Sequence, residues 1–564
     1  MATDDFFRAR LDSMIDMRHP LAVLATRMPW AEIEASLAPV LAHKDRSGRM
    51  VQDADLFGPT AQLSGAGLSN AGRPRLPIRL MVALLYLKHA FNLSDEELCE
   101  RWSENVVWQF FSGMAYYEPR LPCDATQIGR FRRVLGEAGV EQLLKSTIEA
   151  SVSMGAVKKT EFERIIVDTT VQEKAIAHPT DSRLLEIARH KVASAAKRCG
   201  IALKQTFAKE GKELRRKAGG YAHAKQFRRL RRTVKRQRTI LGALMRDAQR
   251  GLDSISQGVA VQEPTALAIA ELMMWLGRAE RIRTQERYSK NKLYALHAPE
   301  VECIGKGKAR KPYEFGVKVS LAVTHKSGLM VGARSFPGNP YDGHTLADQL
   351  EQTNTLLQDI GVKPTTAVVD LGFRGVDEAC APVQIIHRGK FKSLDAQQRR
   401  WLKRRQAIEP AIGHTKSDNR MDRCWLSGSS GDALHAVLCA AGFNIRWLLR
   451  AIAAKGLAAL LLVFSQMALY ATCIGKVLRI APRAVGQRDQ QFESRRYQLM
   501  PIVAAGAREF RRADYILRKL EERGVRFRLL RKIGYLVFRL RFSAFNKIPV
   551  KKVRSARVSN VWHL

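Results

Sequence analysis

Two apolar, β-rich runs of the sequence each reach an aspartate. Residues 164–170 read Arg-Ile-Ile-Val-Asp-Thr-Thr, and residues 365–370 read Thr-Thr-Ala-Val-Val-Asp before the chain opens into Leu-Gly-Phe-Arg-Gly. Runs of this kind predict buried strands, and open sheets keep their sites at the carboxyl ends of such strands. The pattern therefore predicts an α/β core that carries Asp168 and Asp370.

Residues 401–416 place one carboxylate, Glu409, among strong cations. On a helix, Arg405 lies about 40° from Glu409, and Lys416 returns to almost the same face. Pro410 removes a hydrogen-bond donor, so we expect the helix axis to bend just after Glu409. Such a set is typical of a solvated helix face with weak ion pairs, but the two aspartates on strands favour a functional site.

Two aspartates on strands and a glutamate on a helix form the ligand set that phosphoryl transfer by two metals needs. Hard cations prefer oxygen ligands, and two Mg²⁺ ions about 3.5 to 4 Å apart activate the attacking oxygen and stabilise the leaving one. Without metal, clustered carboxylates repel one another strongly. The pattern therefore predicts a site for two Mg²⁺ ions at Asp168, Asp370 and Glu409.

Several ordered segments, covering roughly residues 70–455, resemble the insertion-sequence DDE transposases, specifically the insertion-sequence-five group. They are residues 72–81, 94–97, 121–124, 167–172, 179–182, 297–303 and 340–346, and the Glu409 helix running on to Gly431-Asp432. The resemblance implies an RNase H-like core whose catalytic triad is Asp168, Asp370 and Glu409. Mg²⁺ would be the cofactor, with two ions per site, and Mn²⁺ can substitute for it.

A related signature of this group is Y-x2-R-x3-E-x6-K. Arg405, Glu409 and Lys416 fit it, but Leu402 stands at the tyrosine position, which removes one contact to the DNA end. The resemblance implies that Arg405 and Lys416 hold phosphates near the cut, Arg bidentately and Lys as a point charge.

The resemblance also implies the reaction and the partners. The enzyme would bind the ends of its own insertion sequence, cut them by metal-dependent hydrolysis and join the 3′ ends to target DNA. Its partners would be double-stranded DNA, at terminal inverted repeats and target, and a second or further copy of itself on DNA. The expected location is the bacterial cytoplasm at the nucleoid, with no membrane partner. Two alternatives stay open: an inactive relic that only binds DNA, and an RNase H-like nuclease of other purpose.

The charge of the chain agrees with a DNA partner. Lys plus Arg outnumber Asp plus Glu by 94 to 54, which gives a net charge of +40 and a pI near 10.3. A polyanion is the natural partner of such a surface. The eight cysteines are scattered without a C-x2-C pair, which predicts reduced thiols in a cytosolic protein, with neither a zinc site nor a disulfide scaffold.

The sequence predicts that residues 1–155 form a separate helical domain for DNA binding or dimerisation. Residues 78–90 form an apolar run too short to span a bilayer. Ser94 precedes Glu97 in capping-box spacing, and Asp124 starts a basic helix in the same way. That helix is either a recognition helix in the major groove or a bundle helix with solvated arginines. The first interpretation assigns DNA contact to Arg130, Arg132 and Arg133.

The catalytic domain, residues 160–455, is interrupted between its first two strands by a basic helical insertion, residues 172–300. We expect breaks at Gly219-Gly220 and Gln257-Gly258. This layer either clamps DNA phosphates or is a solvated helical hairpin. The clamp would use four arginines: Arg228, Arg229, Arg231 and Arg232.

After the insertion the pattern returns to strands. It predicts a hairpin over 313–336 with a turn at 325–328, a helix over 345–359, and a last short strand at 385–388 after the Asp370 strand. His344 either touches the scissile region or has a capping or packing role.

The sequence predicts that residues 456–564 form a basic C-terminal extension of unclear role. This extension is either an accessory DNA-binding module or sequence acquired from a flanking reading frame. Residues 456–475 carry no charge, but they extend a helix that should pack on the core, so we expect no membrane insertion. An amphipathic helix is expected at 504–523 and a basic hairpin after it. The expected fold class is thus an α/β RNase H-like core with an all-α N-terminal domain, a basic helical insertion and this extension.

Overall fold

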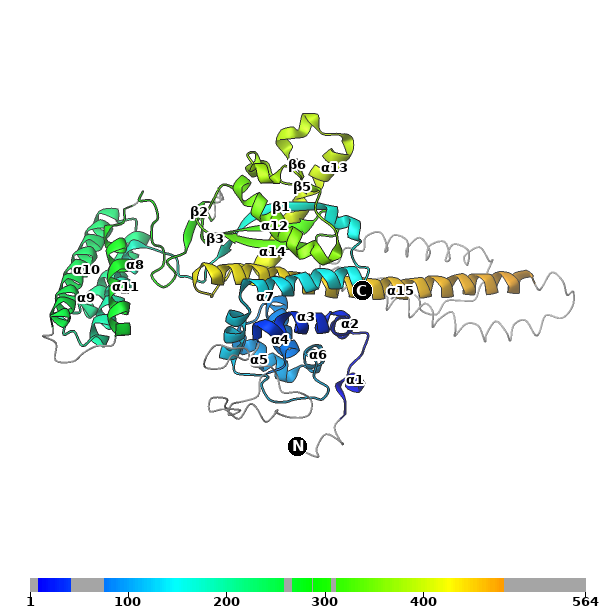
Figure 1. Cartoon of the computed structure of the whole chain (residues 1–564), viewed down its shortest axis with the longest axis horizontal. Coiled ribbons are helices and arrows are strands. Elements are labelled where there is room, and N and C mark those ends of the chain that lie inside the picture. The colour runs from blue at the N-terminus through cyan, green and yellow to red at the C-terminus, as the bar shows by residue number, and fades with distance from the viewer. Residues whose placement is uncertain (1–8, 42–75, 258–265, 287, 306–310, 481–564) are drawn as a thin grey trace, which may run out of the picture. The chain divides into compact units, whose positions relative to one another are not determined.

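The structure is a computed structural model that describes residues 9–41, 76–257, 266–286, 288–305 and 311–480, with side chains up to residue 456 (Figure 1). The chain divides into two compact units, residues 1–459 and 460–564. The predicted helix at 504–523 and the predicted hairpin after it lie outside the described residues, as do residues 72–75 and Gly258.

The N-terminal region is helical, as predicted. Its helices are α1 (Leu11–Met14), α2 (Pro20–Arg27), α3 (Trp30–Leu41), α4 (Ile78–Phe91), α5 (Asp95–Glu104), α6 (Val106–Phe111) and α7 (Ala125–Ser153). Ser94 Oγ accepts a hydrogen bond from Glu97 N at 3.0 Å, and Asp124 Oδ1 accepts one from Thr126 N at 2.9 Å. Both predicted N-caps are therefore confirmed.

A mixed sheet forms the centre of the first unit. Among the described residues its strands are β1 (Arg164–Glu173), β2 (Glu302–Gly305), β3 (Tyr313–Thr324), β4 (Met330–Phe336), β5 (Thr366–Val368) and β6 (Gln384–Ile386). β3 is antiparallel to β1 on one edge and to β2 and β4 on the other, whereas β1, β5 and β6 are parallel to one another. The predicted hairpin is β3–β4, and the predicted last strand is β6. Strand β2 was not predicted.

Between β1 and β2 the described chain forms the helices α8 (Asp181–Arg198), α9 (Ala208–His223), α10 (Phe227–Ser256) and α11 (Ala266–Thr284). Helices α8, α10 and α11 pack around an apolar cluster of their own. The predicted break at Gln257 is confirmed, but the break at Gly219-Gly220 is wrong. Helix α9 continues through both glycines, because a glycine inside a helix costs only about 1 kcal/mol.

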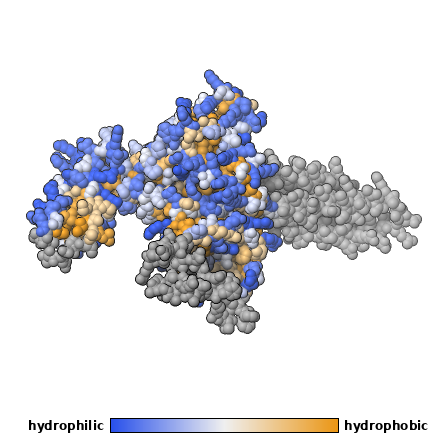
Figure 2. All heavy atoms as spheres, viewed as in Figure 1, coloured by the Kyte–Doolittle hydropathy of each residue, from blue (hydrophilic) through white to orange (hydrophobic). Residues whose placement is uncertain are grey.

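The face of α8–α11 that Figure 2 shows is mostly hydrophilic, and apolar residues gather beside α11. Exposed apolar side chains of α11 include those of Leu267 and Met273. Helix α10 carries the densest run of arginines in this layer.

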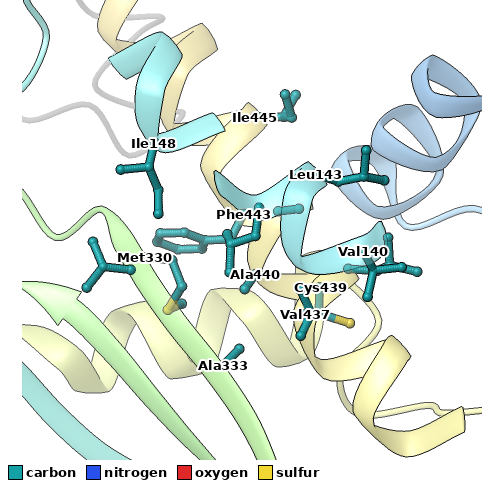
Figure 3. Packing of buried hydrophobic residues seen from close by; sticks show 14 of the residues in the cluster. Val140, Leu143, Ile148, Met330, Ala333, Val437, Cys439, Ala440, Phe443 and Ile445 are labelled. Atoms are coloured by element: carbon teal, nitrogen blue, oxygen red, sulfur yellow. The ribbon is translucent and has the colours of Figure 1, made fainter. Parts of the chain in front are cut away.

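Helices α12 (Leu346–Leu357), α14 (Ile408–Asp418) and α15 (Gly428–Ile480) accompany the sheet, with α13 (Ala396–Arg404) leading into α14. The residues of α15, such as Phe443, lie between α7 and Met330 of β4 (Figure 3). Buried residues of the N-terminal helices, the sheet and α15 form one apolar cluster. The N-terminal helices are therefore not separate from the sheet, because they share its core.

One helix in the described part of the chain, Gly428–Gly456, is long and apolar enough to cross a membrane by length and composition. Most of its apolar window, 61%, is buried inside the protein. Core helices of soluble proteins have the same properties, and the cluster that α15 shares with the sheet accounts for its apolarity.

Candidate active site

Arg405 joins two of the three predicted catalytic carboxylates. Its Nη1 atom lies 3.3 Å from Asp168 Oδ2, and its Nη2 atom lies 3.6 Å from Glu409 Oε1. Asp168 and Arg405 are largely buried, with side-chain exposures of 16% and 21%, whereas Glu409 is 64% exposed. The structure thus gathers a strand aspartate and a helix glutamate around one guanidinium.

Asp168 lies in the middle of β1, which continues to Glu173, and not near the end of its strand as the sequence pattern predicted. Its side chain is held locally, since Asp168 Oδ1 accepts a hydrogen bond from Thr169 N at 2.8 Å.

Asp370 lies two residues beyond the end of β5 at Val368. The parallel pairing of β1 and β5 aligns Ile166 with Val368. Continued by two residues past the last pair, this register would set Asp370 beside Asp168, and paired residues on neighbouring strands point to the same face. Asp370 Oδ1 accepts a hydrogen bond from Gly372 N at 2.8 Å, which fixes the carboxylate where the strand ends.

The helix that carries Glu409 begins differently from the prediction. A short 3₁₀ turn, Arg405–Ala407, separates α13 from α14, and α14 begins at Ile408. Pro410 therefore stands in the first turn of α14, where its missing N–H has no intrahelical partner to lose. The predicted bend after Glu409 is wrong, because the break in the helix comes before Glu409.

Asp342 is a site residue whose role the sequence did not reveal. It opens the 3₁₀ turn Asp342–Thr345, and its Oδ1 atom accepts hydrogen bonds from Lys318 Nζ at 2.9 Å and Thr169 Oγ1 at 3.0 Å. A Cβ at residue 372 would stand 2.7 Å from Asp342 Oδ2 and 2.9 Å from Asp370 Oδ1, so these two carboxylates are close. Asp342 lies within a segment that the resemblance had already marked, but its spacing gave no signal for a fourth carboxylate.

Lys416 is engaged within the protein. Its Nζ atom lies 3.1 Å from Glu314 Oε2, and the Glu314 side chain is only 5% exposed. Lys416 therefore neutralises a buried carboxylate of β3.

Of the three arginines of α7 that were predicted to contact DNA, one is buried and the other two are exposed. Arg132 is buried, and its Nη2 atom lies 3.3 Å from Oδ2 of Asp95, whose other carboxylate oxygen pairs with Lys88. The prediction of DNA contact for Arg132 is corrected, because its guanidinium points into the N-terminal helices. Arg130 and Arg133 are exposed. The four predicted arginines of α10 are all exposed: Arg228, Arg229, Arg231 and Arg232.

His344 pairs with Asp377 through its Nδ1 atom at 2.7 Å and contacts the ring of Tyr341. Its side chain is 61% exposed, on the turn that begins with Asp342. His344 therefore makes a local packing contact next to the carboxylates.

Two family models match the sequence. The model described as Transposase domain (DUF772) matches residues 48–134, and the model described as Transposase DDE domain matches residues 282–445, which include Asp370 and Glu409. The chain is 40% identical over 224 residues to a protein of Rhizobium meliloti named "Uncharacterized protein ORF8 in nfe locus". That alignment covers 40% of this chain and 95% of the relative. No solved structure matches the chain significantly. With a helix-rich fold around a mixed sheet and both transposase domains in one sequence, the chain belongs to a family of insertion-sequence transposases with a DDE domain.

Proposed function

We propose that this transposase acts on the ends of its own insertion sequence, cuts them by metal-dependent hydrolysis and joins the freed 3′ ends to target DNA. We assign it to the insertion-sequence-five group with an RNase H-like core. The observation that carries the proposal is the Arg405 guanidinium between Asp168 and Glu409, with Asp370 just beyond the end of the neighbouring strand β5. The sheet order, an antiparallel hairpin followed by parallel strands, supports the RNase H-like assignment.

The carboxylates of Asp168, Asp370 and Glu409 fit hard divalent cations, since all their donor atoms are oxygens. The Arg405 guanidinium pairs with two of these carboxylates, so the chain itself already places one cation at this acidic group. Two Mg²⁺ ions held there would activate the attacking oxygen and stabilise the leaving one, and Mn²⁺ can substitute. Cutting and joining are both displacements at phosphorus, so one site serves both steps.

The chain's own residues position the DNA. Arg405 orients two carboxylates and keeps N–H groups for a phosphate oxygen, since a guanidinium carries five donors. Lys416 would have to leave Glu314 to contact a phosphate. The exposed arginines of α7 and α10 would contact the phosphate backbone, which positions DNA without reading its sequence. Pairing two element ends needs two active sites, so we infer a homodimer or larger assembly on DNA, in the bacterial cytoplasm.

The test uses purified full-length protein and a labelled duplex that carries the boundaries of its own element. Wild type and Glu409→Gln are compared with and without Mg²⁺, and Glu378→Gln serves as the control, because Glu378 is an exposed glutamate outside the carboxylate group. We expect nicking at the boundary and joined products only with Mg²⁺, in wild type and control and not in Glu409→Gln.

Two other outcomes would replace the proposal. Tight end binding without cleavage in either condition would identify a relic that only binds DNA. Cleavage without joined products would identify a nuclease of other purpose.

A further inference from the structure

We propose that His89, His435 and Cys439 form a buried binding site for a divalent transition metal, with Zn²⁺ as the expected ion. One ligand atom from each residue lies within 4.8 Å of those of the other two. The three residues are 1%, 5% and 0% exposed. His89 comes from α4 and the other two from α15, so the ion would connect the N-terminal helices to the helix that packs on the sheet.

The spacing of the ligands suits a tetrahedral ion. His435 and Cys439 stand four residues apart on α15, so they share one face of the helix. Cys439 Sγ lies 3.7 Å from His89 Nδ1. Zn–S and Zn–N bonds of about 2.3 and 2.0 to 2.1 Å at a tetrahedral angle separate sulfur from nitrogen by about 3.6 Å. The sulfur and nitrogen are therefore already near the separation that zinc requires.

The hydrogen bond of the second ring nitrogen of His435 is also typical of a histidine that binds a metal. His435 Nε2 lies 2.9 Å from the carbonyl oxygen of Arg420, which leaves Nδ1 to coordinate. A histidine ligand usually donates its other ring N–H to a carbonyl or carboxylate, because this bond fixes the ring orientation and the tautomer.

Gly442 allows the two helices to approach at this point. A Cβ at residue 442 would stand 2.6 Å from the backbone carbon of His89, so no larger residue fits without a shift of α4. One turn before Gly442 on the same helix is Cys439. The close contact that brings His89 to Cys439 therefore depends on a glycine.

A buried side chain with an unpaired oxygen atom lies beside His89. Asn419 is 1% exposed, and its Nδ2 atom donates a hydrogen bond to the His89 carbonyl at 2.9 Å. Its Oδ1 atom is buried and has no hydrogen-bond partner. A buried acceptor without a partner is costly, and an ion or an ion-bound water would satisfy it.

The local charges permit the ion. The nearby cations Lys88 and Arg132 are paired with Asp95. Burial lowers the pKa of His435 to about 3, so its ring is neutral near pH 7, as a ligand must be. Burial raises the pKa of the Cys439 thiol, so the thiol enters the site protonated. On binding, the S–H bond breaks, the sulfur forms a bond to the ion, and one proton leaves to solvent.

This site revises the prediction of no zinc site. That prediction depended on cysteine pairs close in sequence, whereas the ligands here are one cysteine and two histidines that the fold brings together from residues 89 and 435–439. The site lies outside the Asp168, Asp370 and Glu409 group, so it is independent of the proposed function.

The first experiment measures metal content by mass spectrometry in full-length protein purified without chelators. We expect about one zinc per chain in wild type, and at least a tenfold lower content in Cys439→Ser and in His435→Gln. Cys380→Ser is the matched control, because Cys380 is a buried cysteine elsewhere. Circular dichroism checks that each variant is folded.

Cobalt and a zinc-selective chelator supply the second readout. Co²⁺ added to metal-free wild type should produce the absorption of a cobalt–thiolate bond and release one proton. With Mg²⁺ in excess, the chelator should lower the melting temperature of wild type and leave that of Cys439→Ser unchanged. Wild type with no zinc as purified and no cobalt–thiolate band after reconstitution would overturn the proposal.

Discussion

Arg405 Nη1 lies 3.3 Å from Asp168 Oδ2 in a largely buried ion pair. The same guanidinium reaches Glu409 at 3.6 Å. Two acidic groups that repel each other are thus held together by one cation of the chain. A divalent ion that binds these carboxylates takes over part of this compensation, so Arg405 and the ion are linked energetically.

Replacing Arg405 with alanine should therefore destabilise the metal-free protein and increase the stabilisation that Mg²⁺ confers. We expect a loss of about 1 to 3 kcal/mol, because Asp168 loses a charged partner at a partly buried site. Thermal unfolding with and without Mg²⁺ measures both effects. Arg400→Ala is the control, since Arg400 is exposed on α13. An equal Mg²⁺ shift in wild type and Arg405→Ala would contradict the link.

Asp342→Asn should lower end cleavage by about 10- to 100-fold, the usual effect of removing a group that orients metal ligands. At residue 342, asparagine keeps an acceptor for Thr169 but lacks the negative charge that aspartate has next to Lys318 and Asp370. If Asp342→Asn cleaved as fast as wild type, Asp342 would have no role in orienting the site.

Asp370→Asn should abolish cleavage and leave end binding within a few fold.

Most of the order of strands and helices, apart from strand β2, could be predicted because it depends on local patterns. The β3–β4 hairpin follows from alternation around a turn, and the N-caps at Ser94 and Asp124 follow from side chains that accept nearby N–H groups. The pattern predicted Asp168, Asp370 and Glu409 as a metal-binding set, and the resemblance implied that they form the catalytic triad. The Arg405 bridge agreed with the expected closeness of Arg405 and Glu409, although a 3₁₀ turn replaces the continuous helix.

What could not be predicted depends on contacts between distant parts of the chain. Arg132 appears in the sequence as one more arginine of a basic helix, but Asp95 lies across from it in the fold. Lys416 likewise meets Glu314. Side chains of these types look solvated in a sequence pattern, because only the tertiary structure decides which of them is buried with a partner.

Removing the arginines of α10 should weaken DNA binding without changing its sequence preference. We expect the Arg228→Ala/Arg229→Ala/Arg231→Ala/Arg232→Ala variant to show a smaller slope of log affinity against log salt. Each lost phosphate contact reduces that slope by about 0.9. Fluorescence anisotropy over a salt series measures it. The control removes Arg18 and Arg101, which are exposed and already paired with Asp16 and Glu97. An unchanged slope would indicate that α10 is a solvated layer.

The stability of the protein should fall in acid through His435. Its pKa is about 3 in the folded chain because of burial, against about 6.5 when unfolded. Between these values only the unfolded state binds this proton, so stability decreases as the pH falls from 6.5, by about 1.4 kcal/mol per pH unit. Urea unfolding of the metal-free protein at several pH values should give a slope smaller by nearly one proton in His435→Gln. Identical slopes would show that His435 is protonated in the fold.

Lys416→Met should destabilise the protein by about 3 to 5 kcal/mol, because the substitution leaves the buried Glu314 carboxylate without its cation. The double variant Lys416→Met/Glu314→Gln removes both charges and should recover most of the stability lost in the single variant. Urea unfolding of the two variants measures the difference. The double variant also separates two roles of Lys416: if the lysine serves only Glu314, end cleavage returns together with stability. If it also holds a phosphate, the double variant folds but cleaves poorly. A Lys416→Met protein as stable as wild type would show that Glu314 does not need this partner.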